Sequence, residues 1–466
     1  MRQRSGWGWV VLAVVLAGCG GELDDSEGED RDPGSRTWHR ASSAPVLSGG
    51  TRRAPRLTGP SEETAGGVAH DGEGNRWVAA NFQGRLSDAV GKLGTSTMRA
   101  CALTKYRPDG QRLWTRIVPA PVTALTTNRE RHVLVTGGFE GSIDLGGGPL
   151  TVGDFLTGIF FAEFDAAGNH VWSRAYPLEF FSFFGARALV TDGQGNIAVT
   201  GLLRGGLYFD SRYVVADSAP VLLRFSPEGL FQWAYVEQPF FGESGGVAVD
   251  EDDHLYMAGT IVTDLYPPLD RIPFVNRLSP TGTRRWQRRV DTVNGEGQGV
   301  AVHGNRVVLT GTFLSPLRFA GQTFRPLHAQ DGFVVAYTRS GDERWGRQLG
   351  LEGLDIAVDH RDDLVVVGRY QHGDDLGRGP VAGSPGSDMN LFAAKFDRLD
   401  GTPRWTRGFA MAHPTGVSTS MDRYRVSVDG QGATTFLGGL IAPLDAGPMT
   451  LAPSGVRDLF LLDLKP

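Results

Sequence analysis

The sequence predicts an all-β fold, a seven-bladed β-propeller closed by an N-terminal strand. A unit of two strands around a turn, ending on Gly, recurs seven times along the 466 residues. A third apolar strand follows every copy, and a Trp-bearing strand follows six of them. Four short strands in each repeat, without a helical pattern between them, are typical of propeller blades, which bury their faces against neighbouring blades.

Residues 1–19, MRQRSGWGWVVLAVVLAGC, have the layout of a lipoprotein signal peptide. Two Arg residues precede an apolar stretch at 7–17 that is too short to span a bilayer. The motif at 16–19, LAGC, is similar to the lipobox of bacterial lipoproteins, in which the peptide is cut before the Cys and the thiol is lipidated. An ordinary signal peptide with a chance Cys is the alternative. We expect a lipid anchor on Cys19 at the cell envelope. By resemblance to enterobacterial lipoprotein sorting, the absence of an Asp directly after Cys19 favours the outer membrane.

Residues 20–36, GGELDDSEGEDRDPGSR, carry seven acidic side chains, two Arg and a single large apolar residue. Such a segment cannot bury enough apolar surface to fold. We expect it to be a disordered acidic tether between the lipid and a propeller at 37–466, whose repeats begin at residue 66. The only other Cys is Cys101, so no intrachain disulfide is expected in the mature chain.

The first two strands of each repeat flank a turn of Asp, Gly, Asn or His. These paired strands lie at 69–81, 125–138, 190–201, 249–260, 302–312, 358–369 and 428–439. The third strands lie at 101–106, 159–164, 221–225, 274–278, 333–338, 391–396 and 459–464.

The fourth strand carries a Trp, and successive Trp residues are 58, 61, 53, 59 and 60 positions apart. These residues are Trp114, Trp172, Trp233, Trp286, Trp345 and Trp405. An Arg lies two positions after the Trp in every strand except the third, which has Tyr235. Because residues two apart share a strand face, we expect each Trp to be wedged between blades with the Arg stem along it.

The seventh unit has no Trp strand after residues 459–464, but a Trp-x-Arg sequence occurs upstream at Trp38. We expect Thr37–Ala41 to form the closing outer strand of the last blade, which would otherwise leave an exposed edge. A chance Trp in a linker is the alternative.

The repeated units, with the pattern AVDxxGNxxVTGxF, then DxFxxxFDxxG, then Trp, resemble the SBBP-type bacterial β-propeller repeats of surface proteins and lipoproteins in myxobacteria and related groups. The resemblance covers residues 66–466 and implies a fold without an assigned activity. The segment FDAAGNHVWSR also resembles the Trp-docking motif of PQQ-type propellers. Those propellers usually have eight blades, and many quinoprotein dehydrogenases have an adjacent Cys pair that this chain lacks.

Several short motifs resemble catalytic or metal-binding loops. The segment 242–246, GESGG, matches G-x-S-x-G, but a strand rather than a helix follows it, so no nucleophile is expected there. Residues 71–75, DGEGN, place oxygen side chains at alternate positions, as calcium loops do. A turn in which Asp71 accepts hydrogen bonds from its own amides explains every copy of the motif. The His residues have no metal-ligand spacing, and we expect no catalytic residue, metal or cofactor.

Two links between blades, at 178–186 and 238–244, are unusually rich in Phe. Their six rings belong to Phe180, Phe181, Phe183, Phe184, Phe240 and Phe241. These links and the long connections between second and third strands are expected on one face of the ring, beside the channel mouth. A cluster of exposed rings there predicts a binding surface, whereas inward rings would only plug the tops of two blades.

These observations together favour a monomeric, non-enzymatic binding or scaffolding protein that is anchored to a membrane and recognises a protein or polysaccharide. An outer-membrane assembly accessory lipoprotein is one alternative, and a carbohydrate-active hydrolase or lyase with its site at the channel mouth is another. The net charge of −6 lacks a basic surplus, so nucleic acid is not an expected partner.

Overall fold

The computed structural model describes residues 51–53, 56–237, 241–263, 270–359, 361–412, 423–447 and 449–465. The predictions for Cys19, the acidic tether, Trp38 and Phe240 lie outside these residues. Residues 47–466 form one compact unit, and its described secondary structure consists of β-strands. No described segment is a helix long and apolar enough to cross a membrane.

Seven antiparallel sheets form the blades, which confirms the predicted propeller. Blade 1 contains β3 (Thr64–His70), β4 (Arg76–Asp88), β5 (Gly91–Tyr106) and β6 (Arg112–Val118). Blade 2 contains β7 (Val122–Thr127), β8 (Val133–Asp144), β9 (Pro149–Phe164) and β10 (His170–Pro177). Blade 3 contains β11 (Phe183–Thr191), β12 (Ile197–Phe209), β13 (Arg212–Phe225) and β14 (Phe231–Val236).

Blades 4 to 6 follow the same order. Blade 4 contains β15 (Phe241–Val249), β16 (Leu255–Val262), β17 (Arg271–Leu278) and β18 (Arg284–Arg289). Blade 5 contains β19 (Gly295–His303), β20 (Arg306–Phe313), β23 (Asp331–Tyr337) and β24 (Glu343–Gln348). Blade 6 contains β25 (Glu352–Val358), β26 (Leu364–Tyr370), β27 (Asn390–Phe396) and β28 (Pro403–Met411). A small hairpin of β21 (Leu317–Phe319) and β22 (Gln322–Phe324) is inserted in blade 5.

Blade 7 combines both ends of the described chain. It contains β29 (Arg425–Val428), β30 (Thr434–Leu440), β33 (Asp458–Leu464), β1 (Thr51–Arg53) and β2 (Arg56–Leu57). Between β30 and β33, the short strands β31 (Leu444–Asp445) and β32 (Thr450–Leu451) pair with each other, and β31 pairs with β28 of blade 6.

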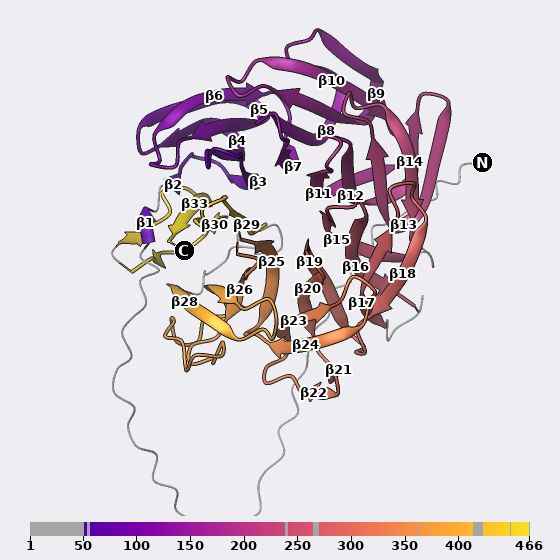
Figure 1. Ribbon diagram of the computed structural model, residues 1–466. Coiled ribbons are helices and arrows are strands. Elements are labelled where there is room, and N and C mark those ends of the chain that lie inside the picture. The colour runs from indigo at the N-terminus through magenta and orange to yellow at the C-terminus, as the bar shows by residue number, and fades with distance from the viewer. Residues whose placement is uncertain are drawn as a thin grey trace, which may run out of the picture. The chain divides into compact units, whose positions relative to one another are not determined.

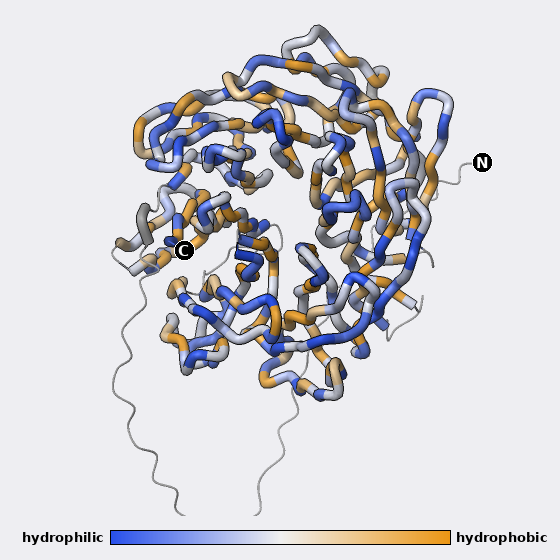
Figure 2. Tube along the Cα trace, viewed as in Figure 1, coloured by the Kyte–Doolittle hydropathy of each residue, from blue (hydrophilic) through white to orange (hydrophobic). Residues whose placement is uncertain are grey.

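The first strand of every blade lies nearest the centre of the ring in Figure 1, so these seven inner strands surround the ring axis. Hydrophobic and hydrophilic residues are mixed along the blades in Figure 2, and middle strands such as β23 and β27 are buried over their whole length. The described apolar residues form seven buried clusters, and each cluster combines residues of two neighbouring blades. One of the seven joins blade 7 to blade 1, through Leu459 and Val78, so the ring of cores is closed.

An N-terminal strand closes the last blade, as predicted, but its residues differ from those expected. Thr51 pairs with Leu464 at the start of β1, and Leu57 pairs with Leu459 in β2. The outer edge of β33 is therefore taken by residues 51–53 and 56–57, where we had expected Thr37–Ala41. The closing segment TRRAPRL contains no Trp, so the Trp-x-Arg pattern could not identify it.

The repeated Trp residues dock each blade onto the next. The indole N–H of Trp114, Trp233 and Trp286 donates to a backbone carbonyl in the third-to-fourth-strand turn of the following blade, at 3.2, 3.1 and 2.9 Å. A Cβ on Gly282 would lie 2.8 Å from the Trp233 ring, and its φ of 84° also favours Gly. The side chain of Arg288, two residues after Trp286, donates to the carbonyl of Gly341 in the same neighbouring turn. These contacts support the predicted inter-blade role of the Trp-x-Arg pairs.

Candidate functional site

The two ends of the blades carry different kinds of connection. The turns between first and second strands, such as 71–75, and between third and fourth strands, such as 165–169, lie on one side, which we call the turn face. The links between blades and between second and third strands lie on the opposite side, the connection face. Leu178 of the first Phe-rich link forms a β-bridge with Leu207, beside the second-to-third-strand hairpin of blade 3. This Phe-rich link therefore lies on the connection face, where the sequence analysis placed it.

The predicted Phe cluster divides into exposed and buried rings. Phe180, Phe181 and Phe183 are 63%, 87% and 50% exposed, whereas Phe184 is 7% exposed and belongs to the core between blades 2 and 3. Phe241 is half-buried. The strand alternation of β11 explains the split, because Phe183 and Phe184 are neighbours and must point to opposite sides.

A tight turn presents Phe180 and Phe181 at its tip. The amide of Ser182 donates to the carbonyl of Glu179 at 2.9 Å, which closes the turn. The amide of Gly206 donates to the Ser182 hydroxyl at 2.8 Å and the amide of Glu179 donates to the Gly206 carbonyl at 2.9 Å, so the turn is tied to the neighbouring hairpin. Phe181 has a φ of 63°, in the left-handed region that non-Gly residues rarely adopt. The two rings, 4.2 Å apart, are therefore held in solvent by a fixed backbone.

Two Tyr residues extend this aromatic surface along the hairpin. Tyr208 and Tyr213 are partly exposed, with ring centroids 4.8 Å apart. The Tyr213 hydroxyl donates to a carboxylate oxygen of Glu179 at 2.7 Å, which links the hairpin to the Phe turn. We call Phe180, Phe181, Phe183, Tyr208 and Tyr213 the aromatic patch.

An apolar groove of about 560 Å³ lies beside the aromatic patch, on blades 1 to 3. Phe139, Leu178 and Phe183 contribute to its lining, together with the exposed side chain of Met98. The groove is of the size that small ligands or peptide side chains occupy.

The channel beside Phe183 has a different character, because three Arg side chains line its mouth and the narrower space below. A cavity of about 280 Å³ is lined by Arg187, Arg423, Gln298 and Phe183, and a narrower one of about 180 Å³ deeper in the channel is lined by Arg187, Gln298 and Arg425. Burial and repulsion from Arg425 and Arg423 lower the pKa of Arg187 to about 9. Burial and repulsion from Arg425 lower the pKa of Arg423 to about 10.

A shared irregularity of the inner strands aims residues at this channel. In each of blades 1 to 6, the pairing between the first and second strands shifts register at one point of the first strand. The residues left unpaired at these shifts are Gly66, Thr123, Arg187, 245–246, Gln298 and Leu354. A β-bulge adds one unpaired residue and redirects its side chain, and bulges are frequent next to functional sites. Arg187 and Gln298 are thus bulge residues of blades 3 and 5, and they meet in a hydrogen bond of 2.7 Å between Nη2 and Oε1.

Carboxylates also occur at the mouth, but cations hold them. Nη2 of Arg271 lies 2.7 Å from Oε1 of Glu243 and 2.6 Å from Oε1 of Glu296. Burial, followed by repulsion from Glu243, raises the pKa of Glu296. The hydroxyl of Ser244 donates at 3.4 Å to the carbonyl of Gly245, its one hydrogen bond among the described residues. Ser244 therefore has none of the partners that a catalytic nucleophile needs.

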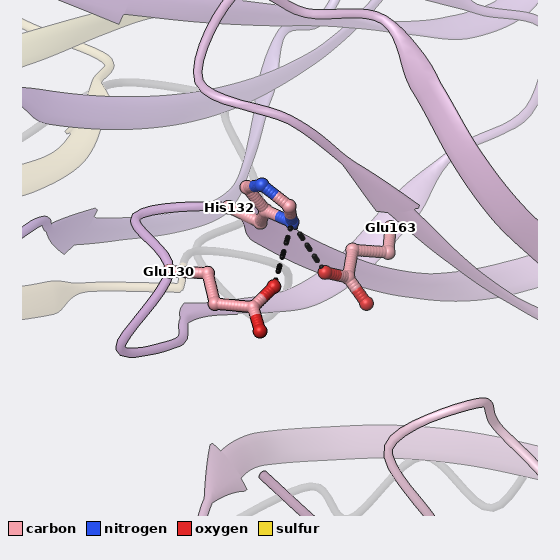
Figure 3. A group of neighbouring side chains, drawn as sticks. All are labelled: Glu130, His132 and Glu163. Atoms are coloured by element: carbon pink, nitrogen blue, oxygen red, sulfur yellow. Dashed lines mark hydrogen bonds and ion pairs between the residues drawn. The ribbon is translucent and has the colours of Figure 1, made fainter.

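Two groups of His and acidic side chains lie on the turn face. Figure 3 shows the first, in which Nδ1 of His132 is 2.6 Å from Oε1 of Glu163 and 3.6 Å from Oε2 of Glu130. Both oxygens of Glu163 already accept hydrogen bonds, from the side-chain amide of Asn128 at 3.1 Å and from the indole N–H of Trp172 at 2.6 Å. These donors stabilise Glu163 without a metal.

The second group, Asp250, Asp252 and His254, occupies the equivalent turn of blade 4. The guanidinium of Arg339 lies 2.6 Å from an oxygen of both Asp250 and Asp252, so a protein cation already pairs with two of the three side chains. Because the two groups share turn positions, the repeat itself accounts for their recurrence.

The possible calcium loop at 71–75 has a similar internal explanation. One oxygen of Asp71 accepts hydrogen bonds from the amides of Glu73 and Asn75, both at 3.0 Å. The other lies 3.0 Å from Nζ of Lys105, a buried ion pair. The carboxylate therefore closes its own turn, as the alternative interpretation predicts.

Sequence reasoning missed the channel arginines and the His132 group. Arg187 and Arg425 stand in inner strands where the equivalent positions of other blades are mostly small or apolar, and this departure is the signal that was available. The spacings Glu130-x-His132 and Asp252-x-His254 were also visible in the sequence as possible metal-ligand pairs. The two side chains of each pair are brought together by a turn between strands rather than by a helix.

No family model matches the chain, and no curated protein matches it. Among solved structures, the β-propeller domain of the Trilobed protease from Pyrococcus furiosus has a TM-score of 0.44 and 10% identity, over 87% of this chain and 94% of that one. The polysaccharide lyase Uly1 has a TM-score of 0.45 and 9% identity, over 86% and 90% of the two chains. A protein of unknown function from Dyadobacter fermentans has a TM-score of 0.42 and 11% identity, over 88% and 98%. The likeness concerns a propeller fold, and we draw no activity from it.

Proposed function

We propose that this chain is a non-enzymatic binding or scaffolding protein, held at the cell envelope by a lipid on Cys19, whose partner contacts the aromatic patch. The observation that carries the proposal is the fixed turn at 179–182, which holds Phe180 and Phe181 in solvent. Exposing two large rings on a strained backbone opposes folding, and strain of this kind is concentrated at functional sites. Aromatic side chains with little conformational freedom are also the residues that dominate protein interfaces.

The partner is a protein or a polysaccharide that presents an apolar surface to the patch and the adjoining groove. The repeat pattern supports an SBBP-type lipoprotein, because its units and its lipobox-like N-terminus occur together. A role as an outer-membrane assembly accessory lipoprotein fits the same surface, since such a protein also acts by contact.

One observation favours the alternative of a carbohydrate-active hydrolase or lyase. Glu243 and Glu296 lie together at the channel mouth, and the raised pKa of Glu296 is a property of acid catalysts. Arg271 binds both carboxylates, however, which ties them into an ion-pair group rather than leaving a free acid and base. We therefore place binding ahead of catalysis.

The test compares capture of partners by the lipid-anchored full-length protein and by the variant Phe180→Ser, Phe181→Ser, Phe183→Ser. Proteins and glycans crosslinked on intact envelopes are quantified for both. The three rings are exposed and outside the core clusters, so the variant is expected to fold and to lose most of the captured material.

Leu399→Ser provides the matched control, because Leu399 is 60% exposed on the turn face. It should capture as much as the natural chain. Equal capture by the three-Phe variant and the control would contradict the proposed contact surface.

A further inference from the structure

We propose that the channel mouth is a binding site for a small molecule that carries a carboxylate, sulfate or phosphate group. The site consists of Arg187, Arg423 and Arg425, with Gln298 and Ser244 beside them. It goes beyond the aromatic patch, because it lies inside the ring and requires neither Phe180 nor Phe181.

Neutral acceptors fix the three guanidinium groups in position. Arg187 donates to the side-chain oxygen of Gln298 at 2.7 Å. Arg423 donates to the backbone carbonyls of Thr123 and Ala186 at 3.0 and 3.3 Å. Arg425 donates from Nη2 to the carbonyl of Arg187 at 3.2 Å, so the inner strands of blades 3 and 7 are joined at the site. The side chains are thereby oriented before a ligand arrives.

The positive charges of the three side chains are incompletely neutralised. Among the described residues, no carboxylate lies within ion-pair distance, 4.0 Å, of a nitrogen of Arg187, Arg423 or Arg425. Asp355 attracts Arg187 and Arg425 from farther away, and its own oxygens accept hydrogen bonds from the amides of Ile356 and Val426, both at 3.0 Å. Glu243 also lines the mouth cavity and attracts Arg187, but Nη2 of Arg271 lies 2.7 Å from its carboxylate, so the charges of the three Arg side chains are only partly balanced.

Such a cluster is unfavourable in the free protein. Moving charged groups out of water is costly unless they are paired, and like charges add repulsion. The lowered pKa values of Arg187 and Arg423 have these two causes. An anion at the mouth would supply the missing charge, so its binding should stabilise the folded chain.

The shape of the site selects an oxyanion of limited size. Guanidinium groups match the oxygens of carboxylate, sulfate and phosphate with paired hydrogen bonds. The cavity of about 280 Å³ at the mouth has room for such a group and for a small organic body. Gly185 and Gly297 also line this cavity, and the Ser244 hydroxyl offers a further donor.

The experiment measures the melting temperature of the full propeller with sodium sulfate, sodium phosphate, citrate or glucuronate, against sodium chloride at equal ionic strength. The inorganic salts and the two organic acids separate a free ion from a charged group on a carbon body. At least one of the four should raise the melting temperature in a saturable manner. Calorimetric titration of that anion then gives the affinity.

Arg187→Gln and Arg423→Gln should each weaken that affinity roughly tenfold or more, because each removes a hydrogen bond between charged groups. Arg318→Gln is the matched control, since Arg318 is exposed on the hairpin of blade 5, outside the site, and it should bind as the natural chain does. The double variant Phe180→Ser, Phe181→Ser, which leaves the cavity-lining Phe183 in place, should also bind normally, so failure of the anion site and failure of the aromatic patch are distinguishable.

Hydrogen exchange on the natural chain keeps the test valid if the Arg variants do not fold. The bound anion should slow exchange at 183–188, 297–299 and 423–426 and leave the turn face unchanged. No saturable effect from any of the four anions, or slowed exchange confined to other segments, would overturn the proposal.

Discussion

Leu57→Ala tests the closure of the ring by residues 51–57. Leu57 is almost fully buried in the cluster between blades 7 and 1, where it pairs with Leu459. The adjacent Thr58 exchanges two backbone hydrogen bonds with Ser87, both at 2.9 Å, so this short segment ties blade 7 to blade 1. Truncating its apolar side chain should loosen the junction that completes the ring.

The expected loss follows from the three carbon atoms that the substitution removes. Their transfer free energy is about 2.5 kcal/mol at ~0.8 kcal/mol for each carbon, and a remaining cavity raises the cost to as much as ~5 kcal/mol. The unfolding entropy of the unit at 47–466, scaled at about 2 cal/mol/K per residue, converts this into a fall of roughly 3–6 °C in melting temperature.

Differential scanning fluorimetry or calorimetry at a fixed scan rate measures this fall. Leu399→Ala, at an exposed position, should melt within about one degree of the natural chain because surface truncations rarely exceed ~0.5 kcal/mol. If Leu57→Ala and Leu399→Ala melt alike, residues 51–57 do not close the ring in solution.

Three further predictions concern docking, pH and anchoring. Gly282→Ala should destabilise the propeller by about 1–3 kcal/mol through collision with Trp233, whereas Gly304→Ala, also at positive φ but in open space, should cost less; equal melting temperatures would exclude the docking contact. Burial and a neighbouring carboxylate raise the pKa of Glu63 to about 8, so the folded chain holds a proton that the unfolded chain has lost, and stability should fall as the pH rises from about 4.5 to about 8. Glu63→Gln should flatten that profile in chemical denaturation series, and an unchanged profile would show that another group is responsible. Cys19→Ser should release the protein from membranes or leave its precursor uncut, and equal membrane retention of the variant in fractionation would exclude the lipid anchor.

The sequence was sufficient for the architecture because each blade repeats a strong local pattern. Alternating apolar strands, Gly-closed turns and regularly spaced Trp residues appear in every unit or nearly every unit, and the structure forms them as strands in the predicted order. The inter-blade role of Trp could also be predicted, because a large aromatic ring on the outer strand of a blade needs a neighbouring blade to bury it.

The closing strand was harder to locate because its signal is not periodic. Residues 51–53 and 56–57 form two short pieces of strand, the first with a register shift inside it, and neither piece has the length to show alternation. The Trp38 pattern was the more visible candidate, but pairing with β33 is determined by the register and packing of Leu57, which a motif search does not consider.

The candidate site was predictable in part. A Phe-rich link between blades could be placed on the connection face, yet the burial of Phe184 depends on which residue begins β11. The position of Arg187 depends on a β-bulge, which adds one residue to a strand without a sequence signature. Arg187 and Arg425 are 238 positions apart, and ring closure alone brings their inner strands together.

Site-specific photocrosslinking tests the central claim, that the connection face is the binding surface, most directly. A photoreactive phenylalanine is placed at Phe181 or, in a second protein, at Leu399 on the turn face, and both are irradiated on intact envelopes. The account predicts a discrete crosslinked partner at position 181 and none at 399. A partner that crosslinks at 399 and not at 181 would contradict it.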